Sequence, residues 1–321
     1  MISGRSATRG SAARIFSPFE VAALDAIGKR IGKRVCDLLG GPVRESIEFS
    51  AYLFYKFGRH RFSEQAIDDP WGEVTTPEAV VEEARRMVAL HGFRSLKLKG
   101  GVFEPEAEIE AMRALRDAFP DAPLRIDPNG NWSVETTLRL LPKLEGLLEY
   151  LEDPVLGIPD MARIRLATSL PLATNMCVVA FSHLPPAIAQ DAVQVVLGDH
   201  HFWGGLVATR ELGRICDTWG LGLSMHSNSH LGISLMAMAH VAAATPNLTY
   251  ASDTHYPWDD VDVVEGGRIR FEEGCIRLPQ APGLGVTLDR SALAKLHENY
   301  LRCPYRTRDD GVEIRKYWPD W

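Results

Sequence analysis

Seven short apolar segments of the sequence each end in a side chain that can bind a metal ion or move a proton. These end residues are Lys99, Asp127, Glu152, Asn175, Asp199, His226 and Asp253. Carboxylate and amide oxygens are ligands for hard cations, whereas lysine and histidine side chains serve as general bases. We therefore expect metal-assisted acid–base chemistry, on condition that the fold brings these side chains together.

Three of the end residues form an all-oxygen set. Asp127, Glu152 and Asn175 occur in succession along the chain. Such a set suits Mg²⁺, which prefers oxygen ligands and retains positions for water or for substrate oxygens. The simpler interpretation, that each side chain only caps the following helix, explains one such residue better than it explains three in a row. We therefore predict Asp127, Glu152 and Asn175 as metal ligands.

Two further pairs have the character of proton-transfer groups. Lys97 and Lys99 are two residues apart on one predicted strand, so both side chains point to the same face. A nearby metal ion and partial burial would lower the pKa of a lysine toward use as a base. His226 ends the strand after the one that ends at Asp199, which is close enough for the carboxylate to orient the imidazole. Lys97, Lys99, Asp199 and His226 are therefore candidate catalytic residues.

The spacing of the end residues predicts the elements that carry them. Successive end residues are 23 to 28 positions apart, the length of one strand, one helix and two loops. Helical patterns fill the gaps, at about 77–90, 104–118, 133–145, 160–168, 182–190, 205–219 and 229–244. In a parallel barrel the carboxyl ends of all strands meet at one rim, where active sites lie. We therefore predict an α/β fold, a modified TIM-type (β/α)7β barrel.

Composition restricts the classes of function. The 321 residues are 45% hydrophobic and 24% charged, with a net charge of −7, which is typical of a globular protein and argues against nucleic acid or an anionic membrane as partner. No apolar run is long enough to span a membrane. The five scattered cysteines form no CxxC pair, which indicates reduced thiols. We expect a cytoplasmic protein.

Longer motifs around the end residues resemble the enolase superfamily, and most closely its D-glucarate dehydratase group, with a barrel like the C-terminal domain of mandelate racemase and muconate lactonizing enzyme. Asn175 is the distinguishing detail, because most of the superfamily has an acid as third metal ligand. The motifs are Leu96-Lys97-Leu98-Lys99-Gly100-Gly101-Val102, Asp127-Pro128-Asn129-Gly130, Glu152-Asp153-Pro154, Ala173-Thr174-Asn175-Met176, Asp199-His200-His201-Phe202-Trp203 and His226-Ser227-Asn228-Ser229-His230. Two departures are Asp199-His200 in place of Asp-Pro, and an Asp199–His226 interval one residue longer than usual.

The resemblance implies a Mg²⁺-dependent carbon–oxygen lyase. Its substrate would be a small dicarboxylic acid sugar of the D-glucarate or L-idarate type, and its product a keto-deoxy acid sugar. Lys99 and His226 would approach the carbon next to the carboxylate from opposite faces, while Lys97 and Asn129 would donate hydrogen bonds to the carboxylate. The remaining substrate-binding residues implied by the family are Tyr52, Phe54, Asn228, His255 and Arg308.

The resemblance also implies a domain organisation. Residues 1–16 are expected to be disordered, and residues 17–50 to be the remnant of a truncated α+β capping domain, with one helix from Pro18 to Leu39. Residues 51–255 would form the catalytic barrel, and residues 256–321 would close the barrel and return to the capping region. We also expect a homo-oligomer.

Two alternatives remain open. A paralogue of the glucarate dehydratases could bind metal or a full-length partner without turnover, or the same pair of bases could serve a racemase or epimerase. Asn175 and the motifs around it favour a dehydratase.

Overall fold

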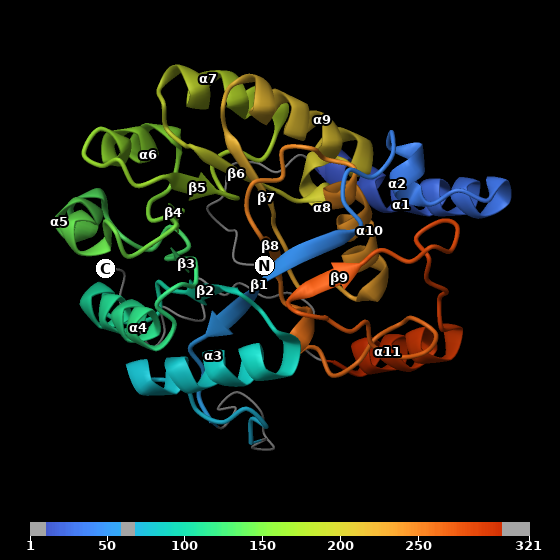
Figure 1. Cartoon of the computed structure of the whole chain (residues 1–321), viewed down its shortest axis with the longest axis horizontal. Helices are drawn as coiled ribbons and strands as arrows, with labels where there is room; N and C mark the ends of the chain where they lie inside the picture. Colours follow the sequence, from blue (N-terminus) through green and yellow to red (C-terminus); the bar gives the residue numbers. More distant parts are fainter. Residues whose placement is uncertain (1–10, 59–67, 304–321) are drawn as a thin grey trace.

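A computed structural model describes residues 11–58 and 68–303, and a parallel β-barrel surrounded by helices is its central feature (Figure 1). The parallel strands are β1 (Ser46–Phe54), β2 (Ser95–Lys99), β3 (Leu124–Asp127), β4 (Tyr150–Glu152), β5 (Leu172–Thr174), β6 (Val195–Gly198), β7 (Gly222–Met225) and β8 (Ser252–Thr254). Their order in the sheet is β7-β6-β5-β4-β3-β2-β1-β8. Each neighbouring pair is parallel, which confirms the predicted barrel.

The segment that leads into β8 is hydrogen-bonded to β7, which brings the two ends of the sheet together. The Thr249 amide donates to the Leu223 carbonyl at 3.0 Å, and the Ser224 hydroxyl donates to the Ala251 carbonyl at 2.8 Å. A ninth strand, β9 (Cys275–Arg277), pairs antiparallel with the beginning of β1. The segment after β8 therefore returns to the barrel at the beginning of β1.

Helices follow seven of the eight strands and form the outer layer. They are α3 (Pro77–His91), α4 (Pro105–Ala118), α5 (Val134–Leu144), α6 (Ile158–Arg165), α7 (Leu184–Ala189), α9 (Leu206–Thr218) and α10 (Gly232–Ala243). Local signals define their ends: the Thr76 hydroxyl accepts a hydrogen bond from the Ala79 amide at the start of α3, and Gly92, with φ of 74°, ends that helix. The repeat matches the (β/α)7β pattern expected from the spacing.

The N-terminal segment differs from the prediction. Helix α1 (Ser11–Ile31) begins before Pro18 and includes residues 11–16, which were expected to be disordered. The guanidinium of Arg14 lies 4.7 Å from the ring of Phe202 in α8 (His200–Trp203), so packing on the barrel stabilises this first turn. The predicted single helix is also divided, because Gly32 at φ of 71° ends α1 before α2 (Val35–Leu38).

The boundary between capping remnant and barrel also shifts. Residues 46–50, assigned to the remnant, belong to β1, where Ser50 pairs with Ser95 of β2 and with Asp253 of β8. The alternating residues Ile47, Phe49 and Leu53 are fully buried against the helices. Ser50 and Tyr52 are buried on the opposite face. The strand is therefore covered on both sides, as is typical of a strand within a parallel barrel.

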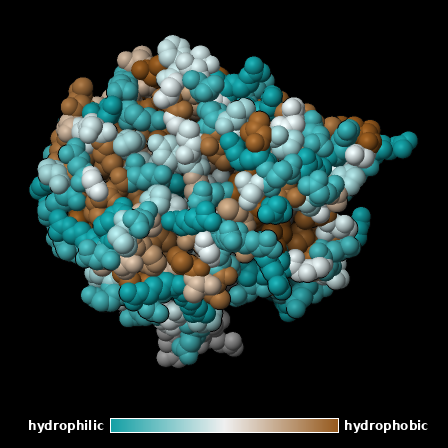
Figure 2. All heavy atoms as spheres, viewed as in Figure 1, coloured by the Kyte–Doolittle hydropathy of each residue, from teal (hydrophilic) through white to brown (hydrophobic). Residues whose placement is uncertain are grey.

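The outer surface is mixed in character. Figure 2 shows hydrophilic atoms over most of the viewed face, with hydrophobic atoms between them and along α1. Within residues 11–58 and 68–303, none of the helices has both the length and the apolar character that are needed to cross a membrane. A last helix, α11 (Arg290–Arg302), packs outside the barrel and has no buried residues.

A charged layer fills the barrel interior below the strand ends. Arg125 is fully buried. Its Nε donates a hydrogen bond to the Glu149 carboxylate at 2.6 Å, and a terminal nitrogen donates to the Ala251 carbonyl at 2.8 Å. Its guanidinium also lies 4.7 Å from the ring of Tyr150 and 3.9 Å from Asp253. One arginine thereby connects β3, β4 and the segment leading into β8.

We predict that Arg125→Met lowers the free energy of unfolding by about 3 kcal/mol, because the buried Asp253 loses a cation and the Ala251 carbonyl loses its donor. Urea denaturation followed by circular dichroism measures the change. Arg113→Met is the matched control, since Arg113 forms an exposed pair with Glu110 at 2.8 Å and should change stability by less than about 1 kcal/mol. Equal effects of the two substitutions would contradict this account of the interior.

Candidate active site

Strand register brings the predicted site residues to one level of the barrel. Lys99 is the partner of Asp127 across β2 and β3, and the Ile126–Leu151 pair places Asp127 beside Glu152 on β4. On the other side of the ring, the Gly198–Met225 pair places Asp199 beside His226. The convergence expected from the sequence is therefore a consequence of in-register parallel pairing.

The three predicted metal ligands form a buried oxygen-rich group. Asp127 and Glu152 are fully buried, and Asn175 is nearly so. The side-chain nitrogen of Asn175 donates a hydrogen bond to a Glu152 oxygen at 2.6 Å. Burial raises the pKa of Glu152 well above its usual value, and the nearby Asp127 carboxylate raises it further. A cation would relieve this repulsion. The donor set therefore fits a hard divalent ion such as Mg²⁺.

Lys97 lies at the bottom of the site as a buried cation. Its Nζ is 2.5 Å from Glu152 and 2.7 Å from Asp253, and it sits 4.8 Å from the centre of the Tyr52 ring. Burial alone would lower its pKa, but the carboxylates of Asp253 and Glu152 outweigh burial and raise it well above the usual value. Lys97 therefore pairs as a cation with both carboxylates, whereas the expected lowering of the lysine pKa depended on a nearby metal ion.

Lys99 occupies the end of the same strand, closer to solvent. Its Nζ lies 2.5 Å from Asp127 and 2.6 Å from the Asn129 side-chain oxygen. Asn129 in turn has φ of 59°, and its backbone amide donates to Asp127 at 2.8 Å. The left-handed backbone at Asn129 folds the loop over the strand end and presents its amide group to the site. Lys99, Asp127 and Asn129 are therefore one connected group.

Asp199 and His226 form the predicted pair. His226 Nδ1 lies 2.9 Å from one oxygen of Asp199, and both side chains are buried. The longer sequence interval does not displace the pair, because the His226 amide donates to the Gly198 carbonyl at 2.7 Å and continues the β6–β7 register. Burial lowers the pKa of His226, while the Asp199 carboxylate opposes that effect.

The described residues that are expected to surround the substrate come from β1 and from the loops after β7 and β8. Tyr52 and Phe54 stack on β1 with ring centres 4.9 Å apart, and His255 packs edge-on against Tyr52 at 4.4 Å. Asn228 is half-buried in the loop after His226, and its carbonyl accepts the His230 amide at 2.7 Å. Arg308 lies outside the described residues. The first four therefore line the strands and loops at the carboxyl ends of β1, β7 and β8.

The sequence analysis missed two carboxylates that hold the loops of the site. Asp153 accepts hydrogen bonds from the Thr174 hydroxyl at 2.5 Å and from the Asn175 amide at 2.8 Å. Glu108 of α4 accepts the backbone amides of Gly101, Val102 and Phe103 at 2.9, 2.8 and 3.0 Å, respectively. Asp153 thus positions Asn175, and Glu108 fixes the loop after Lys99. The only sequence feature that indicated a role for Asp153 was its position between Glu152 and Pro154.

The fold and site define a barrel enzyme with a carboxylate-rich centre flanked by lysine and histidine, and comparison with known proteins agrees. Residues 79–292 match the family model described as enolase C-terminal domain-like. The chain belongs to this family and so to the enolase superfamily. The predicted resemblance is confirmed.

Similar proteins indicate the group within that superfamily. The chain is 52% identical over 309 residues to a "probable glucarate dehydratase" of Streptomyces coelicolor, covering 96% of this chain and 72% of that protein. A Gibberella zeae enolase crystallised with magnesium, formate and sulfate superposes with a TM-score of 0.94 and 54% identity, over 100% of this chain and 75% of that one. A Pseudomonas fluorescens enolase with bound magnesium, potassium and tartrate superposes with a TM-score of 0.92 and 51% identity, over 96% of this chain and 73% of that one. The prediction of a glucarate dehydratase-like enzyme is confirmed.

We predict that Asp199→Asn lowers the pKa of His226 further, because the carboxylate that favours the imidazolium is lost. Histidine-selective NMR titration of metal-free protein measures the shift. His240, whose pKa burial lowers to about 4 and whose Nδ1 accepts the Cys36 amide, is an internal reference that should not move. An unchanged His226 pKa would show that Asp199 does not support it.

Proposed function

We propose that the protein is a Mg²⁺-dependent acid-sugar dehydratase of the D-glucarate and L-idarate type. The observation that carries this proposal is the arrangement of two bases: Lys99 ends β2 and His226 follows β7. The buried Asp127, Glu152 and Asn175 lie at or just after the ends of the strands between them. The names of its relatives support the substrate class, since one is a probable glucarate dehydratase and another binds magnesium and the diacid tartrate.

Asp127, Glu152 and Asn175 would hold the Mg²⁺ ion. Bound there, the ion would supply positive charge that stabilises the negative charge developing on the substrate carboxylate. Lys97, kept cationic by Glu152 and Asp253, would add a hydrogen bond to that carboxylate. Asn129, whose side-chain nitrogen is buried without a hydrogen-bond partner among the described residues, would donate a second one.

The proton transfers would be performed by Lys99 and His226. Either residue removes the proton on the carbon next to the carboxylate, depending on the configuration of that carbon. The imidazolium of His226 then gives a proton to the hydroxyl on the next carbon as its carbon–oxygen bond breaks, so water leaves and an enol remains. The enol takes up a proton on carbon and becomes the keto-deoxy acid. Asp199 orients His226 throughout.

The remainder of the substrate would contact the rim residues. Tyr52, Phe54, His255 and Asn228 lie where the distal part of an acid sugar would extend, and Arg308 is proposed to bind its second carboxylate by two hydrogen bonds. The same pair of bases also permits epimerisation at the carbon next to the carboxylate, since one base can remove the proton and the other return it. Dehydration is favoured by the Asp199–His226 pair, which equips His226 to act as an acid.

We predict that calorimetric titration detects one Mg²⁺ per chain and that Asp127→Ala and Glu152→Ala each abolish this binding. The physical reason is that each variant removes one of only two anionic ligands. Glu135→Ala is the matched control, because Glu135 is an exposed carboxylate on α5 that pairs only loosely with Arg163, at 3.8 Å. Unchanged Mg²⁺ affinity in either site variant would count against this ligand set.

We predict that the two bases are separable by substrate configuration. Lys99→Met should stop deuterium incorporation from D₂O into one of the two C5 epimers, D-glucarate or L-idarate, while largely sparing the other. His226→Gln should do the reverse and also block formation of keto acid, because the general acid is lost. Mass spectrometry of substrate and product measures both effects.

The outcomes distinguish the alternatives. Equal loss of exchange on both epimers in each variant would refute the two-base mechanism. Exchange without keto acid in the unmodified protein would favour the epimerase, and no exchange with Mg²⁺ bound would favour the non-catalytic paralogue.

A further inference from the structure

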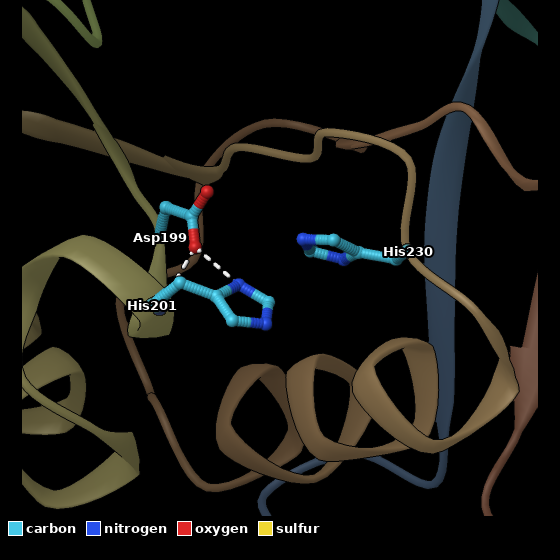
Figure 3. A group of neighbouring side chains, drawn as sticks. All are labelled: Asp199, His201 and His230. Carbon is cyan, nitrogen blue, oxygen red and sulfur yellow. Dashed lines mark hydrogen bonds and ion pairs between the residues drawn. The ribbon is translucent and has the colours of Figure 1, made fainter. Parts of the chain in front are cut away.

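A group of histidines surrounds Asp199 on the side away from the predicted Mg²⁺ ligands. One oxygen of Asp199 lies 2.9 Å from His226 Nδ1, and the other lies 2.9 Å from His201 Nδ1 and accepts the His201 backbone amide. His230, from the loop between β7 and α10, faces the Asp199–His201 pair (Figure 3). The two oxygens of Asp199 therefore serve two different histidines.

His230 is the unexplained member of this group. It is only 3% exposed, and neither ring nitrogen has a hydrogen-bond partner in the part of the chain that the structure describes. Its ring centre is 4.7 Å from that of His201. Burying an unpaired polar group costs free energy, and most native proteins avoid this cost unless the group has another use. The ring points toward the carboxylate and imidazole that could share a ligand with it.

The distances and donor types specify that ligand. The donor atoms of Asp199, His201 and His230 all lie within 4.8 Å of one another. Two imidazole nitrogens and one carboxylate oxygen form a set typical of Zn²⁺ and poorly matched to Mg²⁺. His201 Nε2 also contacts the Ser234 hydroxyl at 3.1 Å, the kind of outer hydrogen bond that fixes a metal-binding imidazole with its opposite nitrogen toward the ion.

We propose that Asp199, His201 and His230 form a second metal site, selective for Zn²⁺ or a similar transition metal, and that its occupancy inhibits the enzyme. Formation of the site requires the His201–Asp199 hydrogen bond to open around the ion and His230 to move closer. Because each ligand comes from the segments that follow β6 and β7, the ion would join these two loops.

Inhibition follows from the shared carboxylate, and this part rests on the proposed role of His226. An ion bound to one oxygen of Asp199 would reposition the carboxylate whose other oxygen lies 2.9 Å from His226 Nδ1. The imidazole of His226 would then lose the contact that orients it for proton transfer. Binding of Zn²⁺ itself does not depend on the proposed reaction.

The test measures binding and activity separately on the full chain with saturating Mg²⁺. Titration with Co²⁺, followed by visible absorption, and with Zn²⁺, followed by calorimetry, should show one site per chain. His230→Phe and His201→Phe should each weaken binding at least tenfold, while thermal denaturation confirms that each variant is folded. His297→Ala removes an exposed histidine of α11 and should bind normally. Asp127→Ala should retain the Zn²⁺ site.

The outcomes are decisive. Zn²⁺ binding that survives both His230→Phe and His201→Phe, or that disappears in Asp127→Ala, overturns the second site, as does the absence of stoichiometric binding. Zn²⁺ should also suppress deuterium exchange by His226 in the unmodified protein and leave residual exchange by His230→Phe unaffected. Stoichiometric binding at the histidines without loss of exchange overturns the inhibition and leaves the proposed dehydratase reaction unaffected.

Discussion

The structure depends on how opposite charges are balanced inside the barrel. Lys97 is fully buried between Glu152 and Asp253, and Asp253 is in turn close to the buried Arg125. An isolated buried charge is very costly, so each of these groups is tolerated only because a partner of opposite sign is held beside it. Parallel register places such partners at neighbouring strand ends, as it does for Lys99 and Asp127. The catalytic level of the barrel and its structural interior are therefore parts of one charge network.

This network explains which part of the site could be predicted from the sequence. A residue at the end of a parallel strand has its position set by the sheet, so the placement of Lys99, Asp127 and Glu152 at neighbouring strand ends could be predicted from residue type and spacing. Asn175 and His226 each follow directly after a strand, and their placement was predicted in the same way. The catalytic and metal-binding roles of these residues stay predictions. The even spacing also predicted the strands β2 to β8 and the helices between them. The pattern of regular secondary structure was therefore sufficient to predict the placement of side chains whose position is set by strand pairing.

Loops and helix ends were less predictable, because their course depends on contacts distant in sequence. Asp153 and Glu108 hold site loops through backbone amides, and neither belongs to a periodic pattern that reveals this. The start of α1 was misplaced for a related reason: Pro18 is typical of a first turn, but here packing of Arg14 on Phe202 supports an earlier turn. Roles of side chains toward substrate stay predictions, because the position of a side chain does not by itself specify what it binds.

Asp199 shows how one such loop residue joins several functions. Its side chain accepts the His201 amide at the start of α8, which sets the direction of the chain after β6, and it contacts both His201 and His226. Burial would raise the pKa of this carboxyl, but the hydrogen bonds from His201 and His226 outweigh burial and hold it well below its usual range. Asp199 therefore stays ionised, and the histidines beside it compete for a single negative charge. If a positive group bound on the His201 side, it would share this negative charge with His226, so the proposed base would be coupled to what its neighbouring histidines bind.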